Sequence, residues 1–378
     1  MIKLALDCRF VQIQREGMGR AALDIIRLLK GQYEIHLLTN ISAGGVPELE
    51  GETSIVWHSA GPRSTKASAV WENITVPGLL RKICPDIYHA PFNVGIPFLK
   101  QPGTVYVVTI HDLIPFQFPS SLRWTRRLLW NVGVRESVHY ADAICTDSAY
   151  SKEQIERISK CAAEKTRIVP LCLAKAFLNN HGSPEATACI RKQLGLFGKY
   201  IVYHGGFRAY KNVAKVVAAF ESVCTQSGEQ YSLCLVGRHG DDFIRNVQRV
   251  VERSLYREHI VLPGFLSDVD LAALLGGAAC MLFLSCAEGF GFAPLEALAC
   301  GAPVLCARNT SLPELLGDHV IWVTDDEAPR SIADKIIQIE KDPDSLQRRI
   351  AGGRAHAMKY NEARFRDKLM GVYQELLS

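Results

Sequence analysis

Strand-like and helix-like segments alternate along the whole chain, and this alternation restricts the fold more than any other feature. Short apolar runs are followed by longer segments with helical periodicity, which is typical of parallel sheets covered by helices. The expected strands are 3–6, 35–39, 54–57, 86–89, 105–110, 143–146, 166–169, 200–206, 232–236, 259–262, 281–284, 303–306 and 320–323. The expected helices of the first half are 17–30, 68–83, 121–140 and 149–160. The chain is therefore predicted to be an α/β protein.

The strands fall into two series that are separated by a polar, turn-rich segment at 179–184. A length of 378 residues corresponds to about two domains. We therefore predict two Rossmann-like domains that face a central cleft, covering 1–182 and 183–360. In such domains a ligand binds at the carboxyl ends of the strands.

Composition excludes several classes of protein. A net charge of +4 is too small for a protein built around a nucleic-acid backbone. The 12 cysteines form no C-x-x-C pair, and most lie in apolar strand-like runs, which favours free thiols and a cytoplasmic location. The first residues read as a strand rather than a signal peptide. The longest uncharged run, 271–287, is too short to span a bilayer comfortably.

Two glutamates, Glu288 and Glu296, bracket a loop that is rich in glycine and aromatic residues. A buried strand-like run comes before the loop, and Pro294 suits the first position of a helix after it. Glu296 would then lie in the first turn, and the backbone N–H groups around Gly291 would be available to a phosphate. A carboxylate can accept hydrogen bonds from two hydroxyls, so the pair suits a sugar nucleotide. The alternative is a solvated loop with two surface charges.

The E-x7-E spacing, with Gly301-Ala302-Pro303-Val304 and Ser311-Leu312-Pro313-Glu314 after it, resembles glycosyltransferase family 4. The resemblance covers nearly the whole chain and implies the GT-B fold, with a C-terminal helix (361–378) that crosses back to the N-terminal domain. It also implies retention of configuration at the anomeric carbon. Glu288 would hold the sugar hydroxyls and Glu296 the ribose. Further donor contacts would come from the loop and helix residues Phe290, Gly291, Phe292 and Leu295.

A second loop, Gly205-Gly206-Phe207-Arg208-Ala209-Tyr210-Lys211-Asn212, follows the first strand of the second series. The glycines let the backbone approach a ligand at Gly206, and Arg208 with Lys211 could clamp a diphosphate and stabilise its charge as it departs. Many family members carry the arginine directly before this lysine or five residues before it, where this chain has Tyr210 and Gly206. Arg208 is therefore our candidate to take the role of that arginine. The alternative is two surface cations at a helix cap.

Three further places resemble donor contacts of the family. His111 ends a buried strand, and we assign it to orientation of the transferred sugar, with Asp112 organising the loop. Gly19 lies in a glycine loop before the first helix, where the alternative is a turn without a ligand. Backbone groups near Phe265 and Leu266 are expected to bind the nucleobase. Asp268-Val269-Asp270 matches a metal-binding D-x-D pattern, but Ser267 before it indicates a helix N-cap, so no metal is implied.

A basic helix interleaved with tryptophans, 122–130, places Arg123, Arg126, Arg127 and Trp130 on one face. Such a face suits an anionic membrane or a diphospholipid acceptor, and the alternative is an ordinary solvated surface. The location expected from the sequence is cytoplasmic, with peripheral contact at the inner face of the membrane if that helix binds lipid.

The function predicted from the sequence is transfer of a hexose from a nucleoside diphosphate sugar to a hydroxyl acceptor in surface polysaccharide biosynthesis. UDP-glucose ranks ahead of GDP-mannose, and the acceptor is a glycan or a lipid-linked glycan. No second carboxylate is placed behind the anomeric carbon, which favours front-face attack over double displacement. The alternatives are a sugar-nucleotide epimerase, a phosphorylase of GT-B fold, a nicotinamide-dependent oxidoreductase and a non-catalytic sugar-nucleotide-binding protein.

Overall fold

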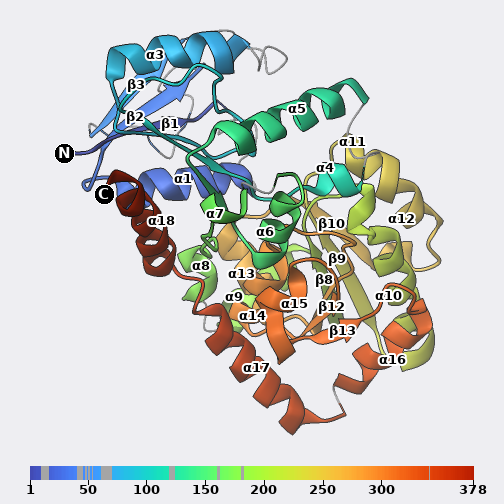
Figure 1. The fold of residues 1–378 in the computed structure, drawn as a ribbon. Helices are drawn as coiled ribbons and strands as arrows, with labels where there is room; N and C mark the ends of the chain where they lie inside the picture. Colours follow the sequence, from blue (N-terminus) through green and yellow to red (C-terminus); the bar gives the residue numbers. More distant parts are fainter. Residues whose placement is uncertain are drawn as a thin grey trace. The chain divides into compact units, whose positions relative to one another are not determined.

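A computed structural model describes residues 1–9, 17–40, 46, 49, 52, 54–60, 70–118, 124–159, 162–179, 183–339 and 341–378. These residues form two compact units (Figure 1). Unit 1 contains Met1–Cys172 together with Glu362–Ser378, and unit 2 contains Leu173–Asn361.

Unit 1 is built on a parallel sheet whose described strands follow the order β3-β2-β1-β4-β5-β6-β7. The strands are β1 (Lys3–Asp7), β2 (Glu34–Thr39), β3 (Ile55–Ser59), β4 (Ile87–Ala90), β5 (Val105–Thr109), β6 (Ala143–Thr146) and β7 (Thr166–Ile168). Most of their residues are buried and many are apolar, as expected for strands covered on both faces. The strand order reverses between β1 and β4, which marks the usual ligand position of such sheets.

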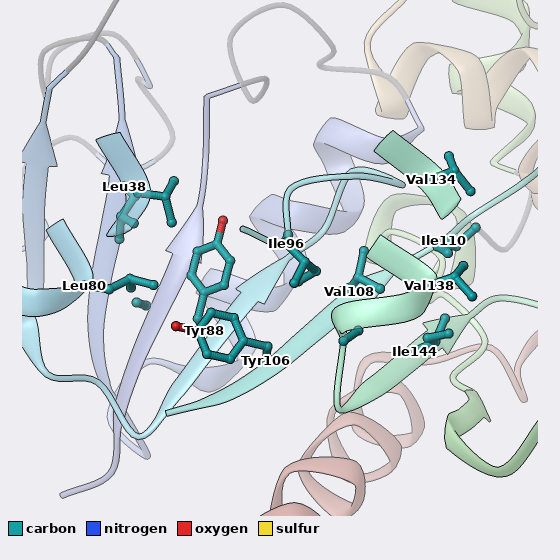
Figure 2. Packing of buried hydrophobic residues seen from close by; sticks show 14 of the residues in the cluster. Leu38, Leu80, Tyr88, Ile96, Tyr106, Val108, Ile110, Val134, Val138 and Ile144 are labelled. Atoms are coloured by element: carbon teal, nitrogen blue, oxygen red, sulfur yellow. The ribbon is translucent and has the colours of Figure 1, made fainter. Parts of the chain in front are cut away.

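Helices cover the sheet of unit 1 and close its core. They are α1 (Met18–Leu29), α3 (Val76–Ile83), α4 (Ile114–Gln117), α5 (Trp124–Tyr140), α6 (Ala149–Glu156), α7 (Ala162–Lys165) and α18 (Glu362–Leu377), with a π-helical turn (Trp71–Thr75) before α3. Figure 2 shows part of this core, where Leu80 of α3 and Val134 and Val138 of α5 pack with sheet residues. Tyr88 and Tyr106 meet edge to face there, with ring centroids 5.7 Å apart.

The C-terminal helix α18 belongs to unit 1, although the chain has passed through unit 2 before reaching it. It packs beside α1, and Tyr373 is completely buried (Figure 1). The Tyr373 hydroxyl lies 2.6 Å from Nδ1 of His89 on β4. Burial lowers the pKa of His89 to about 3, so this histidine stays neutral near pH 7. The predicted return of the last helix to the N-terminal domain is confirmed.

Unit 2 has a second parallel sheet, with the described strands in the order β10-β9-β8-β11-β12-β13. The strands are β8 (Lys199–His204), β9 (Tyr231–Val236), β10 (Ile260–Gly264), β11 (Cys280–Phe283), β12 (Val304–Ala307) and β13 (Ile321–Val323). Here the order reverses between β8 and β11. The loops after these two strands are therefore expected to carry the ligand.

The helices of unit 2 alternate with its strands. They are α8 (Lys175–Leu178), α9 (Pro184–Gln193), α10 (Val213–Ser227), α11 (Asp241–Phe243), α12 (Arg249–Arg253), α13 (Asp268–Gly276), α14 (Phe292–Cys300), α15 (Leu312–Leu316), α16 (Pro329–Ile339) and α17 (Pro343–Ala357). A π-helical turn spans Ile244–Gln248, and 3₁₀ turns span Ala209–Lys211, Arg257–His259 and Gly317–His319. The contacts of α10 with α16 and of α14 with α17 are the most extensive between helices of the unit.

Each predicted strand forms, with ends that differ by two residues or fewer from those expected. The first unit ends at Cys172, before the predicted boundary at 182/183, because α8 packs on α13 and α14 of unit 2. The predicted helix at 149–160 ends earlier, at Glu156. Within the described part of the helix predicted at 68–83, Trp71–Thr75 is a π-helical turn and Val76–Ile83 is α-helical. Residues 121–123 of the predicted basic helix, including Arg123, lie outside the described residues.

Candidate active site

The loop after β8 is closely packed against the loops of its neighbouring strands. Gly205 has φ +144°, and a Cβ on Gly237, which follows β9, would lie 2.2 Å from the Gly205 carbonyl oxygen. Only glycine fits such an approach. The N–H of Gly237 in turn donates to the carbonyl of Gly264 at the end of β10, at 3.0 Å. The carboxyl ends of β8, β9 and β10 are therefore held together, with Gly206 exposed at the edge.

Lys211 and Glu288 are brought together from the loops after β8 and β11. The 3₁₀ turn at Ala209–Lys211, followed by Asn212 with φ 55°, directs the lysine to this position. Its Nζ lies 2.6 Å from Oε1 of Glu288, and both side chains are largely buried. Burial opposes the charged form of Lys211, but the Glu288 carboxylate outweighs it and raises the pKa of the lysine. Lys211 is therefore charged at neutral pH.

Arg208 is placed differently from Lys211. Its side chain is 56% exposed, and its Nε lies 3.7 Å from Oδ2 of Asp242 on α11. Its Nη1 also donates to the Tyr210 hydroxyl at 3.4 Å. Arg208 borders a hollow of about 200 Å³ beside the start of α10. Its role as the second cation of a clamp stays a prediction.

The loop that carries Glu288 is fixed by hydrogen bonds to the segment after β12. The Glu288 N–H donates to Oγ1 of Thr310 at 3.0 Å, and the Ser311 hydroxyl bonds the carbonyls of Glu288 and Phe290 at 2.9 and 3.1 Å. Gly291 has φ +109°, and a Cβ there would lie 2.8 Å from Leu312. These contacts order the turn that leads into α14.

Helix α14 begins at Phe292, so the prediction that Pro294 takes the first helical position is wrong. The left-handed Gly291 starts the helix two residues earlier, and Glu296 consequently falls beyond the first turn. Leu295 is completely buried, whereas Phe290 packs edge to face on Phe292 at 5.1 Å. The predicted donor contacts still lie around one turn at the carboxyl edge of the sheet; they are Phe290, Gly291, Phe292 and Leu295.

Glu296 is almost fully buried and has a partner that the sequence did not suggest. Its Oε2 lies 2.8 Å from Nε2 of His204, the last residue of β8. The glutamate side chain is 2% exposed and that of His204 is 23% exposed. The carboxylate predicted to hold a ribose is thus already joined to a histidine at the reversal point of the sheet.

The predicted base-binding residues lie at the end of β10. Phe265 is 60% exposed, and the Arg238 guanidinium lies 5.2 Å from its ring centroid. Leu266 is partly buried. The Ser267 hydroxyl accepts from the N–H of Asp270 at 3.1 Å, so the predicted N-cap of α13 is confirmed.

In unit 1, His111 follows β5 and is held by a second buried pair. Its Nδ1 lies 2.8 Å from Oδ2 of Asp147, which follows β6, and its Nε2 lies 3.2 Å from the carbonyl of Pro91. Burial opposes the charge of the ring, but Asp147 outweighs this and raises the pKa of His111. The Asp112 carboxylate accepts from the Ile114 N–H at 3.1 Å and organises the loop, as expected. Gly19 is buried in α1, and residues 10–16 before it are outside the description.

The His111–Asp147 pair predicts how stability changes with pH. Because the folded state raises the His111 pKa above 6.5, the stabilisation is complete below that pH and is lost as pH rises through the folded value. We expect the melting temperature to fall as the pH rises above about 6.5, with a free-energy slope of at most about 1.4 kcal/mol per pH unit. Asp147→Asn should flatten this slope, and Asp367→Asn, on the exposed surface of α18, should not. Equal slopes in the wild type and Asp147→Asn would contradict the assignment.

Comparison with known proteins identifies the family of the chain. The family model for glycosyl transferases group 1 matches residues 190–356, and that for the glycosyl transferase 4-like domain matches residues 16–172. The chain belongs to glycosyltransferase family 4. The O-antigen chain mannosyltransferase B of Escherichia coli is 26% identical over 375 residues, which covers 95% of this chain and 96% of that protein.

Two other similar proteins extend the comparison. The N-acetyl-alpha-D-glucosaminyl L-malate synthase of Bacillus anthracis is 34% identical over 194 residues, covering 50% of this chain and 48% of that protein. The crystal structure of Anabaena HepE in complex with UDP-glucose has a TM-score of 0.79 at 16% identity, covering 99% of this chain and 100% of that one. The fold of this family 4 chain is therefore GT-B, as predicted.

Proposed function

We propose that the protein transfers a hexose from a nucleoside diphosphate sugar to a hydroxyl of a glycan or lipid-linked glycan in surface polysaccharide biosynthesis, with retention at the anomeric carbon. The observation that carries the proposal is the Lys211–Glu288 pair, at 2.6 Å, on the loops after β8 and β11. These are the two strands between which the sheet order reverses. A cation for a diphosphate and an acceptor for sugar hydroxyls thus lie side by side where an α/β sheet binds its ligand.

The chemistry follows from exchange of partners at this pair. A donor diphosphate would take the place of Glu288 beside Lys211, and the freed carboxylate would accept hydrogen bonds from hydroxyls of the sugar. Lys211, assisted by Arg208, would then stabilise the negative charge that grows as the diphosphate departs. In this scheme a metal is not required, and the departing phosphate assists attack from its own face. His111 would contact the sugar by exchanging the Pro91 carbonyl for a hydroxyl.

The donor sugar is proposed from the relatives rather than from the site. The sequence prediction ranked glucose ahead of mannose. The relative that aligns along nearly the whole chain is named as a mannosyltransferase, so we propose mannose first and keep glucose as the alternative. The segment that aligns with an N-acetylglucosaminyl enzyme covers only half of the chain.

A panel of UDP- and GDP-sugars in a thermal-shift assay tests the donor, followed by product analysis with an oligosaccharide acceptor. A rise in melting temperature with one nucleoside diphosphate sugar, and an acceptor-dependent α-linked product, are expected. Conversion of the donor without an acceptor would identify an epimerase, and a demand for inorganic phosphate would identify a phosphorylase. Stabilisation by the ligand without turnover would instead indicate a sugar-nucleotide sensor.

Helix α5 carries the surface that we propose for contact with an anionic membrane. Trp124 and Leu129 are 73% and 66% exposed, and Leu128 is also exposed near Arg126 and Arg127. Trp130, predicted on the exposed face, instead packs on Phe116 with ring centroids 5.0 Å apart. None of the described helices is both long and apolar enough to cross a bilayer. Apolar insertion beside arginines is the combination that suits binding at the surface of a membrane.

Liposome sedimentation tests this surface. Each arginine near an anionic bilayer contributes roughly 1 kcal/mol, so Arg126→Ser with Arg127→Ser should weaken binding by about 30-fold. Binding should also fade as salt rises. Arg249→Ser with Arg253→Ser, on exposed positions of α12, is the matched control and should bind as the wild type does. Wild-type protein that stays in the supernatant with anionic vesicles at low salt would rule out the membrane surface and favour a soluble acceptor.

A further inference from the structure

Glu296 is an unusual residue for the helix that carries it. The other residues of α14 are Phe, Ala, Pro, Leu, Ala, Leu, Ala and Cys, and most of the helix is buried. A carboxylate in such surroundings destabilises the fold unless another polar group satisfies it. His204 supplies such a partner, at 2.8 Å. A purely structural position would be filled more stably by another apolar residue.

The two members of this pair differ in how far solvent can reach them. The Glu296 side chain is 2% exposed and the His204 side chain 23%. His204 is also the residue from which the Gly205-Gly206 loop departs, and that loop leads to Lys211. A ligand that places its diphosphate near Lys211 therefore meets the imidazole before it can meet the carboxylate of Glu296.

We propose that His204 is a donor-binding residue that touches the ribose of the nucleotide, and that Glu296 orients its ring. The Nε2–H donates to Glu296, which leaves Nδ1 as the second polar atom of the ring. A ribose hydroxyl both donates and accepts hydrogen bonds, so it can pair with Nδ1 in either protonation state of the histidine. This inference rests on the proposed use of a nucleoside diphosphate sugar and adds a residue to its ribose subsite.

Calorimetric binding of UDP and GDP, each compared with its 2′-deoxy counterpart, tests the inference. For the nucleotide that binds, we expect the wild type to bind the ribose form about tenfold more tightly than the 2′-deoxy form. A difference of this size corresponds to one charge-assisted hydrogen bond. His204→Phe should abolish this preference by weakening only the ribose form. His204→Gln, whose amide can still bond Glu296, should keep part of it.

Controls separate a ligand contact from a structural role. His259→Gln is the matched variant, because His259 directly precedes β10 and so lies at the opposite edge of the same sheet. It should keep the wild-type preference. A wild-type preference retained in His204→Phe, or a wild type that does not distinguish the two sugars, would overturn the inference while leaving the proposed function intact. A wild type that binds neither nucleotide would overturn both.

Discussion

Replacement of Lys211 by alanine is expected to lower turnover by about 10²- to 10³-fold, because one preorganised cation at a departing diphosphate contributes that much to catalysis. The side chain is largely buried, and its Nζ lies 2.6 Å from Oε1 of Glu288. Steady-state kinetics with the donor found in the ligand panel measure the effect. The loss should appear mainly in kcat, since the charge on the diphosphate grows in the transition state.

Lys215→Ala is the matched control for this variant. Lys215 lies one turn further along, in α10, and its Nζ bonds the Asp325 carbonyl at 2.7 Å rather than the site. Its loss should leave turnover within about twofold of the wild type, as for most surface substitutions. EDTA should also leave turnover largely intact. Activity that EDTA removes and Mg²⁺ or Mn²⁺ restores would contradict the assignment to Lys211 and make Asp268 and Asp270 candidate ligands.

Glu288→Gln should separate the two members of the pair. In the free protein the Glu288 carboxylate competes with a diphosphate for Lys211, at 2.6 Å. The neutral amide removes that competition, so binding of UDP or GDP should become tighter while turnover falls. Weaker nucleotide binding in Glu288→Gln would show that the carboxylate supports the diphosphate site rather than occupying it.

The positions of the strands along the chain could be predicted from the sequence because apolar runs and turn residues are local signals. The start of α14 could not, because Pro294 is compatible with several positions in a first turn. Its register was set by Gly291, whose left-handed conformation faces Leu312 of a later helix. In the same way Arg208 and Lys211 look equivalent in the sequence. The fold turns Lys211 toward Glu288 and leaves Arg208 beside Asp242.

Asp147 and His204 were missed for a related reason. Asp147 directly follows a buried strand and His204 ends one, which is the signal that identified His111. Neither residue, however, lies in a motif of the family that the sequence resembles. Their importance comes from partners on other elements: His111 lies 36 residues before Asp147, and Glu296 lies 92 residues after His204. Such pairs form only because adjacent parallel strands and the helices that follow them place their ends at one edge of a sheet.

Glu296→Gln is expected to weaken nucleotide binding by about 1.5–3 kcal/mol, which is roughly 10- to 100-fold, because hydrogen bonds to a charged group are lost. The amide keeps the size of the side chain and can still bond His204, so α14 should keep its packing and the protein its melting temperature within a few degrees. Isothermal titration with UDP and GDP measures the change. Glu258→Gln, at an exposed position before β10, is the control and should bind nucleotide as the wild type does.

The pattern of losses in Glu296→Gln also distinguishes its role from that of Lys211. A residue of the ribose subsite, whether it binds the ribose or orients His204, contributes equally in the ground state and the transition state, so its loss should raise KM with little change in kcat. Lys211→Ala should show the reverse. Unchanged affinity for both nucleotides in Glu296→Gln would remove the glutamate from the donor site. The buried His204–Glu296 pair would then have to be explained by folding alone, through a loss of stability when either partner is replaced by an apolar residue.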